Sequence, residues 1–260
     1  MLLPDADHIL LVGRLRSAGC VFAEDEARLL AAGAEDAGEL EMLLERRMTG
    51  IPLEQVLGWA AFCGLRIVVK PGVFVPRRRT EFLATRAAAI IKPGDRVVDL
   101  CCGTGAVAAR ILDQVQGIEV YATDIDPAAV RCAELNLAGR GTAREGDLFD
   151  ALPPSIAGRI NVVVVNAPYV PSDAIALMPP EARNHEPIVA LDGGPDGLDL
   201  HRRIAGAASQ WLASDGTLLI ETSRAQRIET LAIFTAAGFT ARAETSAKVD
   251  ATIVVATRHG

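Results

Sequence analysis

A strand-to-helix junction in the middle of the chain carries the residues with the clearest chemistry. In the stretch VVDLCCGTGAVAA, Gly103, Gly105 and Ala108 match the pattern G-x-G-x-x-A, which lets a ligand approach the backbone beside a helix N-terminus. Asp124 lies 21 residues after Gly103, at the end of the next apolar run, where a carboxylate can accept hydrogen bonds from both hydroxyls of a ribose. This spacing predicts a ligand with a ribose, the alternative being a glycine-rich helix start that binds nothing.

The acid at the end of the first strand separates two classes of ligand. Asp99 would repel the pyrophosphate of a dinucleotide, whereas S-adenosylmethionine (SAM) carries a sulfonium and an ammonium group that a carboxylate attracts. The pattern D-x-x-x-G-x-G resembles the SAM loop of Rossmann-like methyltransferases, which usually have a third glycine where this chain has Cys101. In the stretch EGDLFD, Asp147 is placed to accept the adenine amine, with Leu148 against the ring. We therefore predict SAM as the cofactor. The predicted cofactor-binding residues are Asp99, Cys101, Gly103, Thr104, Gly105, Asp124, Ile125, Asp147, Leu148 and Asn166.

A second candidate site is the tetrapeptide Asn166-Ala167-Pro168-Tyr169, which follows a run of valines typical of a strand buried on both faces. An amide nitrogen is a poor nucleophile because its lone pair is delocalised into the carbonyl. The Asn166 side-chain oxygen and the Ala167 carbonyl could hold both amide hydrogens and so aim the lone pair at a methyl carbon, while Tyr169 stacks on the planar group. The tetrapeptide resembles the N/D-P-P-Y/F signature of methyltransferases that act on such nitrogens, with Ala167 in place of the first proline. We predict these four residues as catalytic, the alternative being a turn that only closes the strand.

The order of elements along the chain predicts how these motifs are held. From about residue 80 onward, apolar runs alternate with helical stretches, which indicates a parallel sheet with helices on both faces and ligands at the carboxyl ends of the strands. Residues 5 to about 47 show helical spacing, and the next stretch switches to β-type residues with turn signals. We therefore predict an α/β fold, a Rossmann-like class I SAM-dependent methyltransferase sheet. The predicted parts are a helical substrate-recognition domain over 1–57, a β-hairpin linker over 58–78 and the methyltransferase domain over 79–260.

Further stretches resemble one family, the protein-(glutamine-N5) methyltransferases of the PrmC/HemK type, over about residues 20–240. They are PLEQVLGWAAFCGLRIVVKPGVFVPRRRTEFL with its P-R-x-x-T-E segment, GDLFDAL, EARNHEPIVALDGGPDGLDL and LLIETSRAQ. The resemblance implies transfer of a methyl group from SAM to a glutamine side-chain amide of a protein. In that family the acceptor is the Gly-Gly-Gln loop of a release factor or a glutamine of a ribosomal protein. The implied substrate-binding residues are Asn166, Tyr169, Arg77 and Glu186.

The departures from the family pattern leave other functions open. Arg78 and Arg79 stand where the family has Pro-Glu, and this arginine run is either a solvated helix start or a substrate contact. One alternative is a methyltransferase that acts on an exocyclic base amine or a small molecule, because the same tetrapeptide type serves such amines. Another is a SAM-binding protein without catalysis.

Composition restricts the class of protein. The net charge of −7 argues against a direct nucleic-acid partner, and no apolar run reaches the length of about 18 residues that a membrane span needs. The odd number of cysteines, five, and the absence of a CxxC pair favour free thiols in the cytoplasm over a disulfide framework or a metal site. The acids Asp5 and Asp7 near the start argue against a secretion signal. His185 and His201 are expected at the surface.

Overall fold

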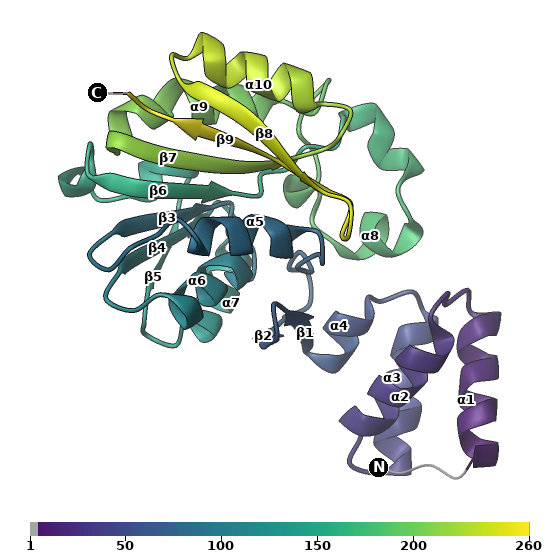
Figure 1. Cartoon of the computed structure of the whole chain (residues 1–260). Helices are drawn as coiled ribbons and strands as arrows, with labels where there is room; N and C mark the ends of the chain where they lie inside the picture. The colour runs from purple at the N-terminus through teal and green to yellow at the C-terminus, as the bar shows by residue number, and fades with distance from the viewer. Residues whose placement is uncertain (1–4, 260) are drawn as a thin grey trace.

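The computed structural model describes residues 5–259 and shows a small helical part beside a larger part built on a sheet (Figure 1). The helices of the small part are α1 (Asp5–Ser17), α2 (Ala23–Gly33), α3 (Ala37–Met48) and α4 (Leu53–Leu57). They enclose a core of their own around Leu15, Leu30 and Leu44. Residues 1–4 of the predicted helical domain lie outside the described residues.

A short hairpin joins the two parts. Strands β1 (Trp59–Phe62) and β2 (Leu65–Val68) pair antiparallel, and the two residues between them, Cys63 and Gly64, have φ values of 50° and 81°. Two consecutive positive φ values are typical of the tight turns whose twist suits a hairpin. The hairpin occupies the first half of the predicted linker, and the chain then runs without regular structure to the next helix.

The large part is built on a seven-stranded sheet with the order β5-β4-β3-β6-β7-β9-β8. Its strands are β3 (Arg96–Leu100), β4 (Glu119–Asp124), β5 (Thr142–Glu145), β6 (Ile160–Val165), β7 (Leu212–Thr222), β8 (Thr240–Ser246) and β9 (Ala251–Thr257). The pairs among β3 to β7 are parallel, as predicted, but β9 runs antiparallel to both β7 and β8. The all-parallel prediction is wrong there because only four residues join β8 to β9, too few for a crossover between parallel strands.

Helices cover both faces of the sheet (Figure 1). Helices α5 (Thr80–Ala88), α6 (Ala106–Gln114) and α7 (Pro127–Leu137) lie on one face, and α9 (Asp199–Trp211) and α10 (Arg227–Ala236) lie on the other. Val162 and Val164 belong to the first core, whereas Val163 and Val165 belong to the second. Successive side chains of a strand point to opposite faces, so burial on both sides explains the run of valines. The short helices are α8 (Pro180–His185) and 3-10 turns at Leu148–Ala151, Pro154–Ile156, Ser172–Leu177 and Ile188–Ala190.

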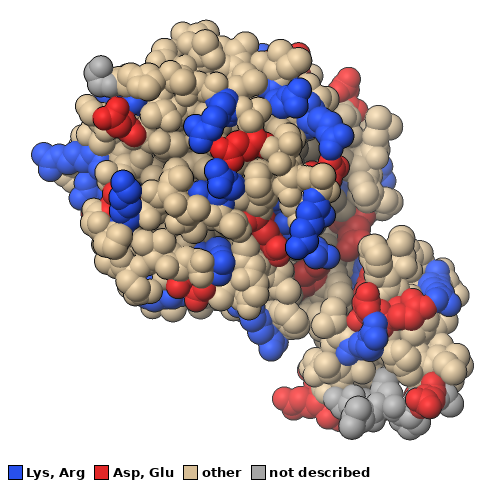
Figure 2. Space-filling view, viewed as in Figure 1, with Lys and Arg blue, Asp and Glu red and all other residues tan. Residues whose placement is uncertain are grey.

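Polar contacts tie the helical part to α8. Arg47 of α3 is buried, donates to Glu26 of α2 at 2.6 Å, and lies 3.5 Å from Glu181 of α8. Gln55 donates to the carbonyl oxygens of Val73 and His185. On the face drawn in Figure 2, Lys and Arg side chains are interspersed with Asp and Glu over both parts. Among the helices within residues 5–259, none has the length and apolar character needed to cross a membrane.

Candidate active site

The predicted site residues surround one cavity at the carboxyl ends of β3, β4 and β6. The cavity has a volume of about 710 Å³. Its lining includes Asp99, Cys101, Gly103, Thr104, Asp124, Ile125, Asp147, Leu148, the tetrapeptide 166–169 and Arg77. Of the predicted site residues, Gly105 and Glu186 are not part of the lining that the described residues form. The parallel strands β3, β4 and β6 all end on one edge of the sheet, which is why motifs as far apart in the chain as Asp99 and Tyr169 meet here.

The glycine loop between β3 and α6 depends on left-handed backbone. Gly105 has a φ of 72°, and a Cβ there would lie 2.9 Å from the Cβ of Ala133, so this glycine allows α6 to approach α7 closely. Cys101 has a φ of 56°, in the region where a side chain is strained and glycine is favoured. The structure thus gives the physical reason why a glycine is usual at this position.

Asp124 anchors the loop at the end of β4. Its carboxylate accepts hydrogen bonds from the backbone N–H groups of Gly103 at 2.8 Å and Asp126 at 2.9 Å. Each oxygen accepts one of these bonds, which leaves lone pairs for hydroxyl donors in the cavity. Burial is the main cause that raises the pKa of Asp124. This geometry fits the predicted contact with a ribose.

Asp99 supplies a buried charge at the base of the cavity. Its side chain accepts from the backbone N–H of Ala108 at 3.0 Å, and only 2% of the residue is exposed. Burial raises the pKa of Asp99 to about 7, and the nearby charge of Asp124 adds to the rise. A cation placed beside it would favour the ionised form. The two carboxylates therefore suit a positively charged ligand such as SAM better than a pyrophosphate.

The predicted adenine end of the cavity is more exposed. Asp147 forms an ion pair with Arg203 of α9 at 2.6 Å, and Ile125 is 53% exposed. Leu148 has a φ of 52° and packs partly against the sheet core. An adenine amine at Asp147 would therefore share the carboxylate with Arg203, and the adenine contact stays a prediction.

Asn166 is held by its nitrogen. The side-chain N–H of Asn166 donates to the Thr80 hydroxyl at 3.4 Å, and its side-chain oxygen has no hydrogen-bond partner within the described part of the chain. Ala167 is buried, so neighbouring residues enclose its backbone although the proline ring of the family signature is absent. The free oxygen at the cavity is the hydrogen-bond acceptor that the predicted orientation of an amide needs.

Tyr169 is fixed at its hydroxyl and on one ring face. The phenol donates to Glu221 at 3.1 Å, and the Arg79 guanidinium lies 5.6 Å from the ring centroid. Burial, followed by the charge of Glu221, raises the pKa of Tyr169 well above its usual value. Thr80 and Glu221 lie in the family-like stretches P-R-x-x-T-E and LLIETSRAQ, but their contacts join segments far apart in the chain, so no role could be predicted for them from the sequence.

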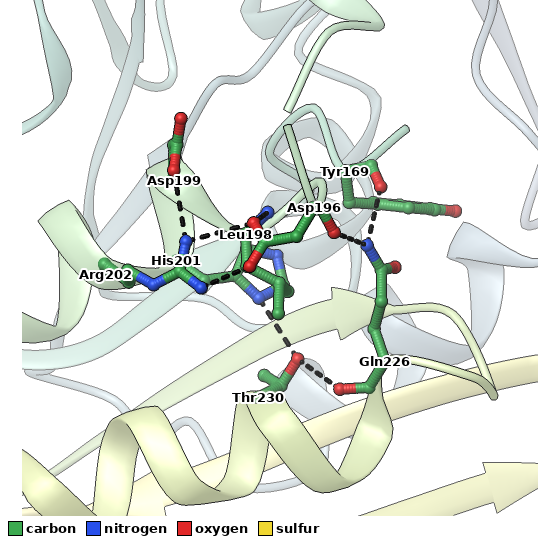
Figure 3. A network of polar contacts seen from close by, with 8 residues as sticks. All are labelled: Tyr169, Asp196, Leu198, Asp199, His201, Arg202, Gln226 and Thr230. Atoms are coloured by element: carbon green, nitrogen blue, oxygen red, sulfur yellow. Dashed lines mark hydrogen bonds and ion pairs between the residues drawn. The ribbon is translucent and has the colours of Figure 1, made fainter. Parts of the chain in front are cut away.

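The main chain of Tyr169 is held by Gln226, as Figure 3 shows. The Gln226 side-chain N–H group donates to the carbonyl oxygens of Tyr169 at 2.9 Å and Asp196 at 3.0 Å. A side chain at Gly197 would collide with the Tyr169 carbonyl, which explains the glycine in that loop. The tetrapeptide and the loop over 193–198 are therefore one packed unit.

The surface prediction for His201 is wrong. This histidine is fully buried between α9 and α10, with its Nδ1 3.3 Å from the Thr230 hydroxyl (Figure 3). Burial lowers the pKa of His201 to about 4, so the ring is neutral at pH 7. The apolar face of an amphipathic helix, rather than any catalytic need, places it there.

Arg77 and Glu186 contact each other. Their ion pair measures 2.5 Å, the Glu186 side chain is completely buried, and it also accepts from the Val75 backbone N–H at 3.2 Å. In this structure the Glu186 oxygens face Arg77 and Val75 and do not line the cavity, so a contact between Glu186 and a substrate stays a prediction. Glu186 fixes Arg77, which does line the cavity.

Comparison with known proteins decides the family. The family model described as "Methyltransferase small domain" matches residues 64–178. The release factor glutamine methyltransferase of Geobacter sulfurreducens is 35% identical over 208 residues, covering 79% of this chain and 72% of that protein. The corresponding protein of Agrobacterium fabrum is 32% identical over 259 residues and covers 90% of each chain. The chain belongs to the release factor glutamine methyltransferase family. It is a SAM-dependent methyltransferase, and the prediction of that family and cofactor is confirmed.

Two other similarities qualify this family assignment. The 4-amino-L-phenylalanine/4-methylamino-L-phenylalanine methyltransferase of Streptomyces pristinaespiralis is 34% identical over 250 residues, covering 87% of this chain and 85% of that protein. Membership of the family therefore does not by itself select the acceptor. A methyltransferase structure from Pyrococcus furiosus has a TM-score of 0.60 at 13% identity, covering 83% of this chain and all of that one, and supports the fold alone.

Proposed function

We propose that this enzyme methylates the side-chain amide of a glutamine presented by a protein, with a release factor as the acceptor. The observation that carries the proposal is Asn166, whose nitrogen is held by Thr80 while its oxygen is free at the cavity. That oxygen can accept one amide hydrogen of a glutamine, and the Ala167 carbonyl can accept the other. Such an acceptor is a component of translation, which would place the reaction in the cytoplasm.

Residues at one end of the cavity would bind the cofactor, and residues at the other end would orient the amide. When bound, SAM supplies an electrophilic methyl group on a sulfonium. Asp99 and Asp124 would hold its charged and hydroxyl groups, and the tetrapeptide would orient the amide. With the amide held in this way, transfer of the methyl group from the sulfonium to the amide nitrogen would release the thioether, and one amide proton would pass to water. Orientation of this kind contributes up to about 7–11 kcal/mol, so no strong base is required.

The helical domain is the proposed docking element for the protein acceptor. Apolar side chains are exposed on α1 and just before α2: Ile9 is 69%, Val21 83% and Phe22 69% exposed. Exposed apolar side chains on a small domain support a role in binding a protein. A Val21→Ser/Phe22→Ser variant should lower kcat/KM for a protein acceptor at least several-fold while SAM affinity, measured by calorimetry, stays unchanged.

A small aromatic amine is the second candidate acceptor. The observations that favour it are the similarity to the aminophenylalanine methyltransferase and the presence of Arg79 at the cavity, where a guanidinium could receive an amino-acid carboxylate. The net charge of −7 and the mixed charges on the face drawn in Figure 2 support a protein or a small molecule over a nucleic acid.

The test compares three methyl acceptors in parallel reactions. Radiolabelled SAM is incubated with the enzyme and a bacterial release factor, its isolated Gly-Gly-Gln peptide, or 4-amino-L-phenylalanine. Label on the glutamine of the intact release factor supports the proposal, label on the free amino acid alone selects the second candidate, and SAM binding without transfer to any acceptor indicates a non-catalytic protein.

Variants of Asn166 test the chemistry in the same assay. Asn166→Ala should lower the rate about 10²–10³-fold, as loss of one oriented contact at a reacting centre does. Asn166→Asp keeps an acceptor oxygen, so we expect the order Asn, then Asp, then Ala. The matched control is Asn161→Ala on β6, the strand that Asn166 follows, because the Asn161 side chain accepts from the Arg96 backbone N–H and does not line the cavity. A parental rate in Asn166→Ala would show that the tetrapeptide is only a turn.

A further inference from the structure

We propose that Glu221 is a positioning residue that holds Tyr169, the tetrapeptide side chain on which a planar acceptor group would stack. The inference rests on the proposed role of the tetrapeptide and adds a residue outside it. Glu221 does not line the cavity formed by the described residues, so its action is through its neighbours.

The sheet register places Glu221 beside the tetrapeptide. Strands β6 and β7 are parallel neighbours, and Val165 pairs with Ile220, so Glu221 lies where β7 runs alongside the chain leaving β6 at Asn166. Both strands end at the cavity edge. A side chain at this point can reach Tyr169 of the tetrapeptide although it does not itself line the cavity.

One carboxylate oxygen of Glu221 accepts hydrogen bonds from two donors. Its Oε1 accepts from the Tyr169 hydroxyl at 3.1 Å and from the Arg79 Nε at 3.2 Å. Arg79 in turn covers one face of the Tyr169 ring, so the phenol is held at its edge and on its face. With Gln226 on the carbonyl of the same residue, Tyr169 has three separate restraints.

Asn166, the other polar side chain of the tetrapeptide, is held separately by Thr80. The Thr80 hydroxyl accepts from the Asn166 side-chain nitrogen at 3.4 Å. Because that nitrogen is engaged, the oxygen of the Asn166 amide is left to accept a hydrogen bond in the cavity. The tetrapeptide is thereby ordered before any acceptor arrives.

The cost of this arrangement argues against a purely structural role. Only 1% of Glu221 is exposed, and its Oε2 is buried with no hydrogen-bond partner among residues 5–259. A half-satisfied buried carboxylate is destabilising, and an apolar residue would pack a strand end better. Residues that lower stability are expected where they organise a functional site.

Glu221→Gln removes the negative charge at position 221 and keeps the shape of the side chain. The amide oxygen can still accept from Tyr169, but the ionic attraction to Arg79 is lost and the ring face is released. We expect kcat to fall about 10- to 100-fold, the range for loss of a charge-assisted hydrogen bond, with the KM for SAM within twofold. Glu244→Gln is the matched control, because Glu244 also pairs with an arginine, Arg86, at 2.7 Å on the far strand of the sheet.

A measurement without any acceptor makes the test independent of the proposed function. The chain has two tyrosines, Tyr121 and Tyr169, so protein labelled with 3-fluorotyrosine gives two fluorine resonances, assigned with Tyr121→Phe. We expect Glu221→Gln to shift or broaden the Tyr169 resonance and leave the Tyr121 resonance in place, while Glu244→Gln changes neither.

Tyr169→Phe keeps the proposal testable if Glu221→Gln does not fold. This variant removes only the hydroxyl that donates to Glu221 and keeps the aromatic ring, so kcat should fall by a similar factor. An unmoved Tyr169 resonance in folded Glu221→Gln, or unchanged kcat in both variants with an acceptor that the parent methylates, would overturn the proposal. If the parent labels none of the three acceptors, the proposed function has failed and the fluorine spectrum still decides the role of Glu221.

Discussion

Replacement of Asp99 by asparagine tests whether the buried acid serves the cofactor. With a pKa of about 7, Asp99 is about one-tenth ionised at pH 6 and nine-tenths ionised at pH 8. If the cationic cofactor binds the ionised form, SAM affinity should be about tenfold weaker at pH 6 than at pH 8, a difference of about 1.4 kcal/mol. Asp99→Asn should remove this dependence and bind SAM about 10- to 100-fold more weakly at pH 8.

The same variant should affect stability in the opposite direction. The folded pKa lies above the ordinary value of 3.8, so the contribution of Asp99 to stability is fully present below pH 4 and is lost as the pH rises through 7. The difference between the two pKa values corresponds to about 4 kcal/mol at most. In urea unfolding at pH 8 without SAM, Asp99→Asn should therefore be more stable than the parent.

Isothermal calorimetry at pH 6, 7 and 8 measures the affinity of both proteins. The variant is the control for titration of Asp124 and of the SAM amino group, because both are present in each protein. A parental affinity that is constant over this range, or a slope that persists in Asp99→Asn, would refute the assignment of Asp99 to the cofactor.

Three further variants test the ribose site and the helical domain. Asp124→Ala should weaken SAM binding by about 1.5–3 kcal/mol in calorimetry, the worth of charge-assisted hydrogen bonds to a hydroxyl, and unchanged affinity in the folded variant contradicts the ribose contact. Arg47→Ala should lower the free energy of unfolding by about 3–5 kcal/mol because it leaves Glu26 buried without its partner. Glu26→Gln/Arg47→Met should recover much of that loss in urea unfolding, and equal destabilisation by both variants would mean that packing rather than charge is lost.

The sequence by itself determined the elements that are recognisable from local pattern. Valine-rich runs predicted buried strands, and the glycine loop with Asp99 and Asp124 predicted a SAM site at their carboxyl ends. These signals are local because strand burial and left-handed turns restrict residue types at neighbouring positions. The antiparallel direction of β9 was not predicted, because strand direction depends on how the chain returns to the sheet.

Only the tertiary structure decided what joins the separate motifs. Glu221 reaches Tyr169 from 52 positions away, and Thr80 reaches Asn166 from 86 positions away. Glu186 proved to be enclosed by Arg77, and His201 proved to be buried, although polar residues are usually expected at the surface. Burial and hydrogen-bond partners are properties of the packed chain, because they depend on which segments the sheet brings side by side. No pattern within a single segment of the sequence carries that information.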